Sequence, residues 1–204
     1  DRQWCCDKTK DLVAEGAVCL RGNHDSAASG VAESMNGMAQ RAMDWTKNRL
    51  NAEQRRFLGQ LPMTTELDDI LLVHASANDP GAWSYVTSDL RATGSFRASR
   101  SRIILCGHVH VPMLVSCDRG GTVREQKFPM GLPIPLITSR RWLAVVGSVG
   151  QPRDGVAQAG YVFLDTVANE LTFRRVPYDM GPTVQKIRAS SLPPELALRL
   201  MKGI

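Results

Sequence analysis

Three short apolar runs in this chain each end in a polar loop, and every histidine lies in such a loop. The runs are 17–20, Ile70–Val73 and Ile103–Cys106. The chain has four histidines, which are His24, His74, His108 and His110. Apolar, β-prone runs that break into a loop are typical of strands in an open α/β sheet, which present functional groups at their carboxyl ends. The pattern therefore predicts one site that gathers histidines from strand ends.

The rest of the chain reads as α/β units followed by a run of strands. Periodicity and capping residues predict helices over 7–15, 36–50, 51–60 and 88–93, with a loop at 26–30. Further strands are expected at 64–67, 113–117, 122–128, 142–146, 161–164 and 171–176. Residues 178–204 are expected to form a C-terminal helical tail. This order predicts an α/β (α+β) fold, a four-layer α-β-β-α sandwich, in a single domain over residues 1–204.

Composition excludes several classes of protein. A chain of 204 residues with 43% hydrophobic residues can bury a core, and no apolar run approaches the roughly 20 residues of a membrane helix. The net charge of +5 favours anionic ligands, but no dense basic run with interleaved aromatics predicts nucleic-acid binding. Five cysteines do not form a disulfide framework, so we expect a reducing, cytoplasmic location. The sequence leaves the oligomeric state open.

The residues of the histidine loops suit a metal. Neutral imidazole is a common metal ligand, and the amide oxygen of Asn23 suits a borderline or hard ion. His108 and His110 would diverge on a straight strand, but in a tight loop each can face a different metal. A set of nitrogen and oxygen ligands without thiolates indicates manganese, iron or zinc in a hydrolytic site. Asp25 is expected to hydrogen-bond His24 and make it a general acid, although a carboxylate here can instead cap a helix.

Four stretches in order carry a family resemblance. They are Gly22-Asn23-His24-Asp25, His74 after a strand, Gly107-His108-Val109-His110, and the loop 147–155. The set resembles the calcineurin-like metallophosphoesterase superfamily across nearly the whole chain. The last loop looks like that of a bacterial branch related to diadenosine tetraphosphatases and serine/threonine phosphatases.

The resemblance implies a dinuclear metal site, with Mn²⁺ expected and iron or zinc as alternatives. Asn23, His74 and His108 would bind one ion, and His110 would bind the other. A hydroxide activated by the metals would then attack phosphorus in a phosphate ester.

The resemblance also implies substrate and catalytic roles. His24 would protonate the leaving group or stabilise the phosphoryl group, with Asp25 as its partner. Arg21, Ser148 and Arg153 would contact phosphate, although a turn or surface role remains open for Ser148 and Arg153.

One departure bears on the metal count. The family's Asp-x-His and Gly-Asp motifs, which supply most ligands of the first metal and the bridging carboxylate, do not occur before Arg21. We expect the β-α-β unit that carries them to precede the printed sequence.

Two classes of function follow. The first is a phosphoesterase acting on small phosphate esters, with nucleotide di- or polyphosphates ahead of a phosphoprotein. The second is a metal-deficient, non-catalytic binding module on the same fold. The small phosphorylated substrate is the only partner that the sequence indicates.

Overall fold

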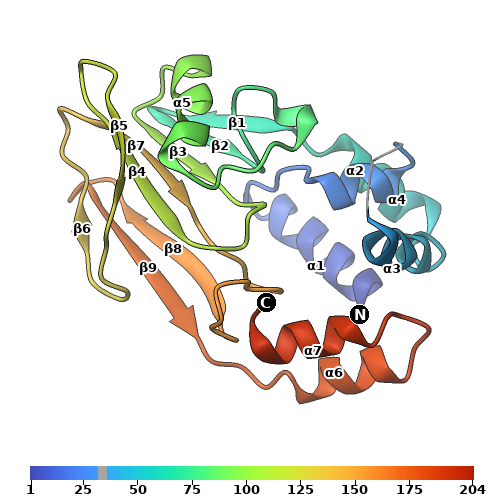
Figure 1. Cartoon of the computed structure of the whole chain (residues 1–204). Helices are drawn as coiled ribbons and strands as arrows, with labels where there is room; N and C mark the ends of the chain where they lie inside the picture. The colour runs from blue at the N-terminus through green and yellow to red at the C-terminus, as the bar shows by residue number, and fades with distance from the viewer. Residues whose placement is uncertain (32–35) are drawn as a thin grey trace.

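The larger of two sheets has a parallel centre. In the computed structural model, which describes residues 1–31 and 36–204, its strand order is β1-β2-β3-β7-β4-β5 (Figure 1). Strands β2, β3 and β7 pair in parallel, whereas the β1–β2, β4–β7 and β4–β5 pairs are antiparallel. The strands are β1 (Thr64–Leu67), β2 (Ile70–Val73), β3 (Ile103–Cys106), β4 (Met113–Cys117), β5 (Val123–Gln126) and β7 (Arg141–Val145). The predicted hairpin and central strands are thus confirmed.

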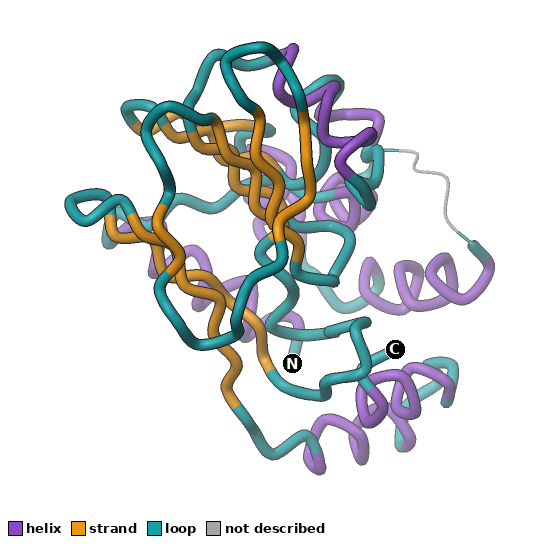
Figure 2. Tube along the Cα trace, turned by 60° about the vertical axis from the view of Figure 1, so that its left-hand side comes forward, coloured by secondary structure: helices purple, strands orange, loops and turns teal. Residues whose placement is uncertain are grey.

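The smaller sheet packs face to face against the larger one. It is antiparallel, in the order β6-β9-β8, with β6 (Ile134–Pro135), β9 (Glu170–Val176) and β8 (Ala159–Asp165). Ile103 and Trp142 of the larger sheet share a buried core with Leu171 and Phe173 of the smaller. Figure 2 shows the two sets of strands side by side with helices around them. The predicted mixed α/β fold with two facing sheets is confirmed, and β6 is a short strand that the sequence pattern did not predict.

Helix α5 (Asp89–Ala98) covers the other face of the larger sheet (Figure 1). Its buried residues Ala92 and Phe96 join a second core that includes Ile104 and Val145. Arg141 anchors the end of this helix, because its guanidinium donates to the carbonyl oxygens of Ser99 at 2.6 Å and Phe96 at 2.7 Å. Apolar side chains therefore fill both faces of the parallel centre, as such sheets require.

Four helices precede the first strand. They are α1 (Arg2–Ala14), α2 (Asn23–Ser29), α3 (Gly37–Lys47) and α4 (Ala52–Gln60). A small core of Cys6, Ala27, Ala28, Met43 and Leu50 holds them together.

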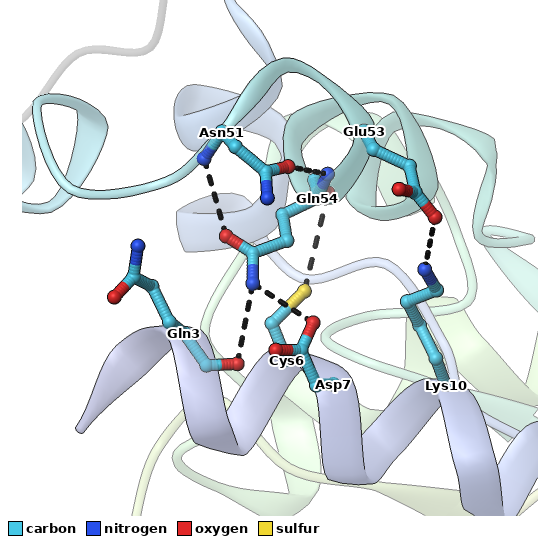
Figure 3. A network of polar contacts seen from close by, with 7 residues as sticks. All are labelled: Gln3, Cys6, Asp7, Lys10, Asn51, Glu53 and Gln54. Atoms are coloured by element: carbon cyan, nitrogen blue, oxygen red, sulfur yellow. Dashed lines mark hydrogen bonds and ion pairs between the residues drawn. The ribbon is translucent and has the colours of Figure 1, made fainter.

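Gln54 ties α1 to α4 (Figure 3). Its backbone N–H donates to the Asn51 Oδ1 at 2.8 Å, and its side chain accepts from the Asn51 N–H at 3.1 Å, which completes the predicted capping box. The same side-chain amide donates to Asp7 at 2.8 Å and to the carbonyl of Gln3 at 3.4 Å. One buried glutamine thus caps the N-terminus of α4 and fixes the position of α1.

Two C-terminal helices pack on each other. They are α6 (Gly181–Arg188) and α7 (Glu195–Lys202), and Val184, Ala197 and Leu200 form their shared core. Both lie within residues 178–204, where the sequence predicts a helical tail. Across the described part of the chain, no helix combines the length and apolarity needed to cross a bilayer.

Two local predictions before the first strand are wrong. Residues 17–20 form a loop and not a buried strand: they have no ladder partner among the described residues, and Val18 is 43% exposed. Residues 26–29, expected as a loop, are the second half of α2, which ends at Gly30 with φ 114°. Short apolar runs become strands only where a neighbouring strand pairs with them, and local pattern does not show that neighbour.

Candidate metal centre

The loops that carry the histidines start at the carboxyl ends of the parallel strands. His74 follows β2 directly, His108 follows β3, and the loop from Gly147 to Arg153 follows β7. Because the three strands are parallel neighbours, their ends lie at one edge of the sheet. This arrangement confirms the strand-end placement that the sequence predicts for His74 and His108.

The loop after β3 has an uncommon backbone. His108 and His110 both have positive φ, 64° and 67°. Non-glycine residues adopt this region rarely and at a cost of about 1–3 kcal/mol, so it is concentrated at functional sites. On a straight strand the side chains at i and i+2 point to the same face, so the divergence expected from the sequence is wrong. The predicted tight loop is present instead, with two left-handed residues.

Three candidate ligands converge on one point. The Nε2 atom of His74 lies 3.2 Å from Asn23 Oδ1 and 3.1 Å from His108 Nδ1. Each of these atoms can bind a metal when its ring nitrogen is unprotonated or, for Asn23, through the amide oxygen, and the set of two imidazoles and an amide oxygen suits manganese, iron or zinc. The described residues contain no group of three or more His, Cys, Asp or Glu side chains placed to hold a metal. The donors therefore fit one side of an ion, with two imidazoles and an amide and no carboxylate.

His110 lies outside this trio and has a defined tautomer. Its Nδ1 is 2.7 Å from the carbonyl oxygen of Gln151, which can only accept, so Nδ1 carries the proton. Its Nε2 is therefore left with a lone pair. This backbone contact is of the kind that orients metal-binding histidines.

Burial keeps the gathered histidines neutral. It is the main cause that lowers the pKa of His74 and of His110 to about 4; neighbouring histidines add to the effect at His74, and Arg153 adds at His110. The pKa of His108 is also lowered by burial, against a hydrogen bond to the Trp83 backbone. Neutral rings at neutral pH are the form that binds metal.

His24 and Asp25 lie in the first turn of α2. In the described part of the chain, no hydrogen bond joins their side chains. Asp25 Oδ2 accepts the Gly22 N–H at 2.9 Å, so the carboxylate caps the helix. The charge of Asp25 raises the pKa of His24, but partial desolvation lowers it more, and Arg153 and Arg2 lower it further. The helix-capping alternative for Asp25 is therefore what the contacts show. The ring of His24 stays exposed beside the candidate ligands.

The predicted phosphate-binding residues separate into two kinds. The guanidinium of Arg21 donates to the Gly59 carbonyl at 2.9 Å and lies 3.2 Å from the Met63 sulfur, so it holds the end of α4. Ser148 Oγ accepts the Gln151 N–H at 3.0 Å and so builds a turn.

Arg153, in contrast, lies at the site. Its N–H donates to the His110 carbonyl at 3.1 Å, and its Nη2 donates to Gln151 Oε1 at 2.9 Å. Its Nε is buried and has no hydrogen-bond partner in the described part of the chain. A buried donor without a partner is unfavourable, and a phosphate oxygen would satisfy it.

Two aromatic rings from one loop form a wall of the site. Tyr85 stacks on His108, with ring centroids 4.1 Å apart at 21°, and Trp83 meets His74 edge-on at 5.9 Å. Trp83 itself has φ 53°, directly after the short 3₁₀ helix Pro80–Ala82. Both rings therefore pack on candidate metal ligands.

Gly22 is a site residue that the sequence reasoning did not assign. A Cβ at this position would lie 2.8 Å from His74 Cε1, so the ring occupies the space that any other residue needs. Its place beside Asn23 in the motif was the available signal.

Comparisons with known proteins agree with this geometry. The profile described as "Calcineurin-like phosphoesterase superfamily domain" matches residues 4–169. An uncharacterized protein of Methanocaldococcus jannaschii, MJ0912, is 31% identical over 206 residues, which covers 98% of this chain and 79% of the relative. A metallophosphoesterase structure from Sphaerobacter thermophilus superposes with a TM-score of 0.86 at 30% identity, covering 99% of this chain and 82% of that one. A hypothetical protein from Pyrococcus horikoshii, PH1004, shares the fold, with a TM-score of 0.71 at 17% identity, covering 97% of this chain and 78% of that one.

A two-sheet fold with histidine-bearing loops at parallel strand ends defines a metallophosphoesterase, a metal-dependent phosphoric ester hydrolase. The chain belongs to the calcineurin-like phosphoesterase superfamily.

Proposed function

We propose that the protein hydrolyses small phosphate esters at a dinuclear site, with nucleotide di- or polyphosphates as its preferred substrates and Mn²⁺ as its metal. The observation that carries the proposal is the meeting of Asn23, His74 and His108 beside Arg153. Ions in such a site supply a nucleophilic water at neutral pH and neutralise phosphoryl charge.

The residues of the chain have separate tasks in this proposal. Asn23, His74 and His108 would hold one ion, and His110 would bind the second through Nε2. Arg153 binds a phosphate oxygen through its free Nε. The oxygen of water bonds to phosphorus and loses its proton to solvent, and the bond from phosphorus to the leaving oxygen breaks. That oxygen takes a proton that we assign to the imidazolium form of His24, which solvent then restores.

A second function stays open on one observation. No carboxylate joins Asn23, His74 and His108 among the described residues. A binding module that has lost its metals would lack such a carboxylate too. The two functions differ in turnover, so one assay separates them.

The first prediction is a substrate order for the intact protein with Mn²⁺. We expect turnover of a dinucleoside polyphosphate to exceed that of an aryl phosphate or aryl phosphodiester, with a phosphopeptide last. The same reactions with excess chelator are the control. Preferential turnover of the phosphopeptide would refute the small-molecule proposal, and no turnover of any substrate would favour the binding module.

The second prediction separates the two arginines. Arg153→Gln should raise KM for the preferred substrate about tenfold, because one charge-assisted contact contributes roughly 1.5–3 kcal/mol. Arg21→Gln removes the same charge from a side chain that donates a hydrogen bond to the Gly59 carbonyl, so it should lower the melting temperature without raising KM. Equal changes in KM for both variants would show that net charge, and not the placement of Arg153, is what binds phosphate.

A further inference from the structure

A cavity of about 610 Å³ is lined by residues of helices α1, α3, α6 and α7. Gln151, which holds the ring of His110, and His24, which follows Asn23, also line it. Its volume is within the roughly 300–1,000 Å³ of sites for small organic ligands. Much of its wall is apolar, and His24 and Arg153 also line it. The apolar residues include Met38, Ala42, Met43, Leu61, Leu196 and Leu200. The exposed ring of His24 thus borders a space large enough for an organic group.

Among the charged residues in the wall, Arg2, Arg153 and Arg199 have no carboxylate partner in the described part of the chain. Lys186 pairs with Asp1, and Arg199 donates to the carbonyl oxygen of Ile204 at 3.0 Å. Asp25 accepts from Gly22 and caps α2. The cavity therefore carries an uncompensated positive charge beside His24.

The guanidinium of Arg2 is held in place without using its hydrogen-bond donors. It lies over the ring of Trp45, 4.2 Å from the centroid, and Arg49 lies over the same ring at 3.7 Å. Arg2 is half-buried and has no hydrogen bond to another described residue. Stacking on an aromatic face fixes the plane of a guanidinium and leaves its N–H edge available for an anion.

Arg153 offers a second free donor to the same cavity. Its Nη2 is held by Gln151, and its buried Nε has no partner among the described residues. Arg2 and Arg153 come from opposite parts of the chain, yet both line the cavity with His24. Two guanidiniums of this kind match the oxygens of a phosphate group.

We propose that this cavity is the leaving-group pocket and that Arg2 and Arg153 bind a second phosphate in it. The substrate class is then a small organic molecule with two or more phosphates joined by an anhydride. Its organic part occupies the apolar wall, and the bond to be broken lies between the cavity and the metal ligands. The inference rests on the proposed function, since it assigns the leaving side of that reaction.

Binding of ADP to the metal-free protein tests the pocket apart from catalysis. Calorimetric titration with excess chelator should show ADP binding more tightly than either adenosine or inorganic phosphate. Arg2→Gln should weaken ADP binding about tenfold to a hundredfold, the range expected for a lost charge-assisted contact. Arg49→Gln is the matched control, since Arg49 stacks on the same ring but does not line the cavity, and its ADP affinity should stay within about twofold.

A second variant tests the volume of the pocket without removing charge. Ala42 lines the cavity from α3, and Ala42→Leu should fill part of it. We expect ADP binding to weaken while binding of inorganic phosphate stays the same. This variant also serves if Arg2→Gln does not fold, which a thermal melt of each variant would show.

The outcomes separate this inference from the proposed function. ADP binding that is absent in the wild type, or equal in Arg2→Gln and Arg49→Gln, overturns the pocket even when the enzyme turns over an aryl phosphate with Mn²⁺. Binding that depends on Arg2 and Ala42 supports the pocket, and if no phosphate ester is then hydrolysed, the hydrolase proposal alone fails.

Discussion

His74→Ala should lower kcat/KM for an aryl phosphate about a thousandfold in the Mn²⁺-loaded intact protein. His74 Nε2 is the atom on which Asn23 and His108 converge, at 3.2 and 3.1 Å, so the variant removes the centre of the ligand set. Metal ions contribute several kcal/mol to the transition state, and each 1.36 kcal/mol is a factor of ten in rate. Calorimetric titration with Mn²⁺ should show the tighter binding event lost, while a thermal melt shows a folded protein.

His110→Ala is the comparison for this experiment. His110 lies outside the trio and is held by Gln151, so its loss should leave most of the tighter Mn²⁺ binding in place. Complete loss of binding in His110→Ala would contradict the assignment of Asn23, His74 and His108 to one ion.

Gly22→Ala should impair the site without touching a ligand. The new Cβ would lie 2.8 Å from Cε1 and 2.9 Å from Nδ1 of His74, closer than real contacts allow. The ring cannot simply retreat, because Trp83 and His108 pack against it, with centroids at 5.9 and 5.0 Å. We expect Mn²⁺ affinity and kcat/KM to fall about tenfold to a hundredfold, as for lost orienting contacts, with roughly 1–3 kcal/mol of overpacking.

Backbone strain does not explain that effect. Gly22 has φ −97° and ψ 175°, which alanine adopts freely, so only the contact with the ring changes. Gly37→Ala is the control: its nearest neighbour is the flexible end of Arg41 at 3.9 Å, and helix α3 should be unchanged or more stable. Titration with Mn²⁺ measures the affinity of both variants for the metal. An unaltered affinity in Gly22→Ala would show that the ring of His74 has room to move.

The strands that carry His74 and His108 were predictable because their signal is local. Four apolar residues followed by a glycine or a histidine form a strand where a neighbouring strand pairs with them, and parallel pairing then brings the strand ends together. An apolar run of the same length at residues 17–20 has no such partner among the described residues and is a loop. The capping box of Asn51 and Gln54 was readable for the same reason, since both partners lie within one turn.

The roles of polar side chains were less predictable, because they depend on partners far along the chain. Arg21 is committed to Gly59, which lies 38 residues away, and no local pattern distinguishes it from Arg153. The cavity depends on Arg2 stacking on Trp45, a contact between two helices whose relative position the sequence does not specify. From the sequence, Asp25 could either hydrogen-bond His24 or cap a helix. The hydrogen bond that it accepts from the Gly22 N–H favours the cap.

The convergence of Asn23, His74 and His108 has a consequence for folding. The contacts from His74 span 51 residues to Asn23 and 34 residues to His108. An ion held by all three residues acts as a cross-link between α2 and the loops after β2 and β3, in a chain whose cysteines are all free. Since the unfolded chain does not assemble this trio, the binding energy of the ion adds to the free energy of unfolding. At a free-ion concentration a hundred times Kd, the gain is about 2.7 kcal/mol. Metal supply then sets how long the folded protein persists as well as how fast it works.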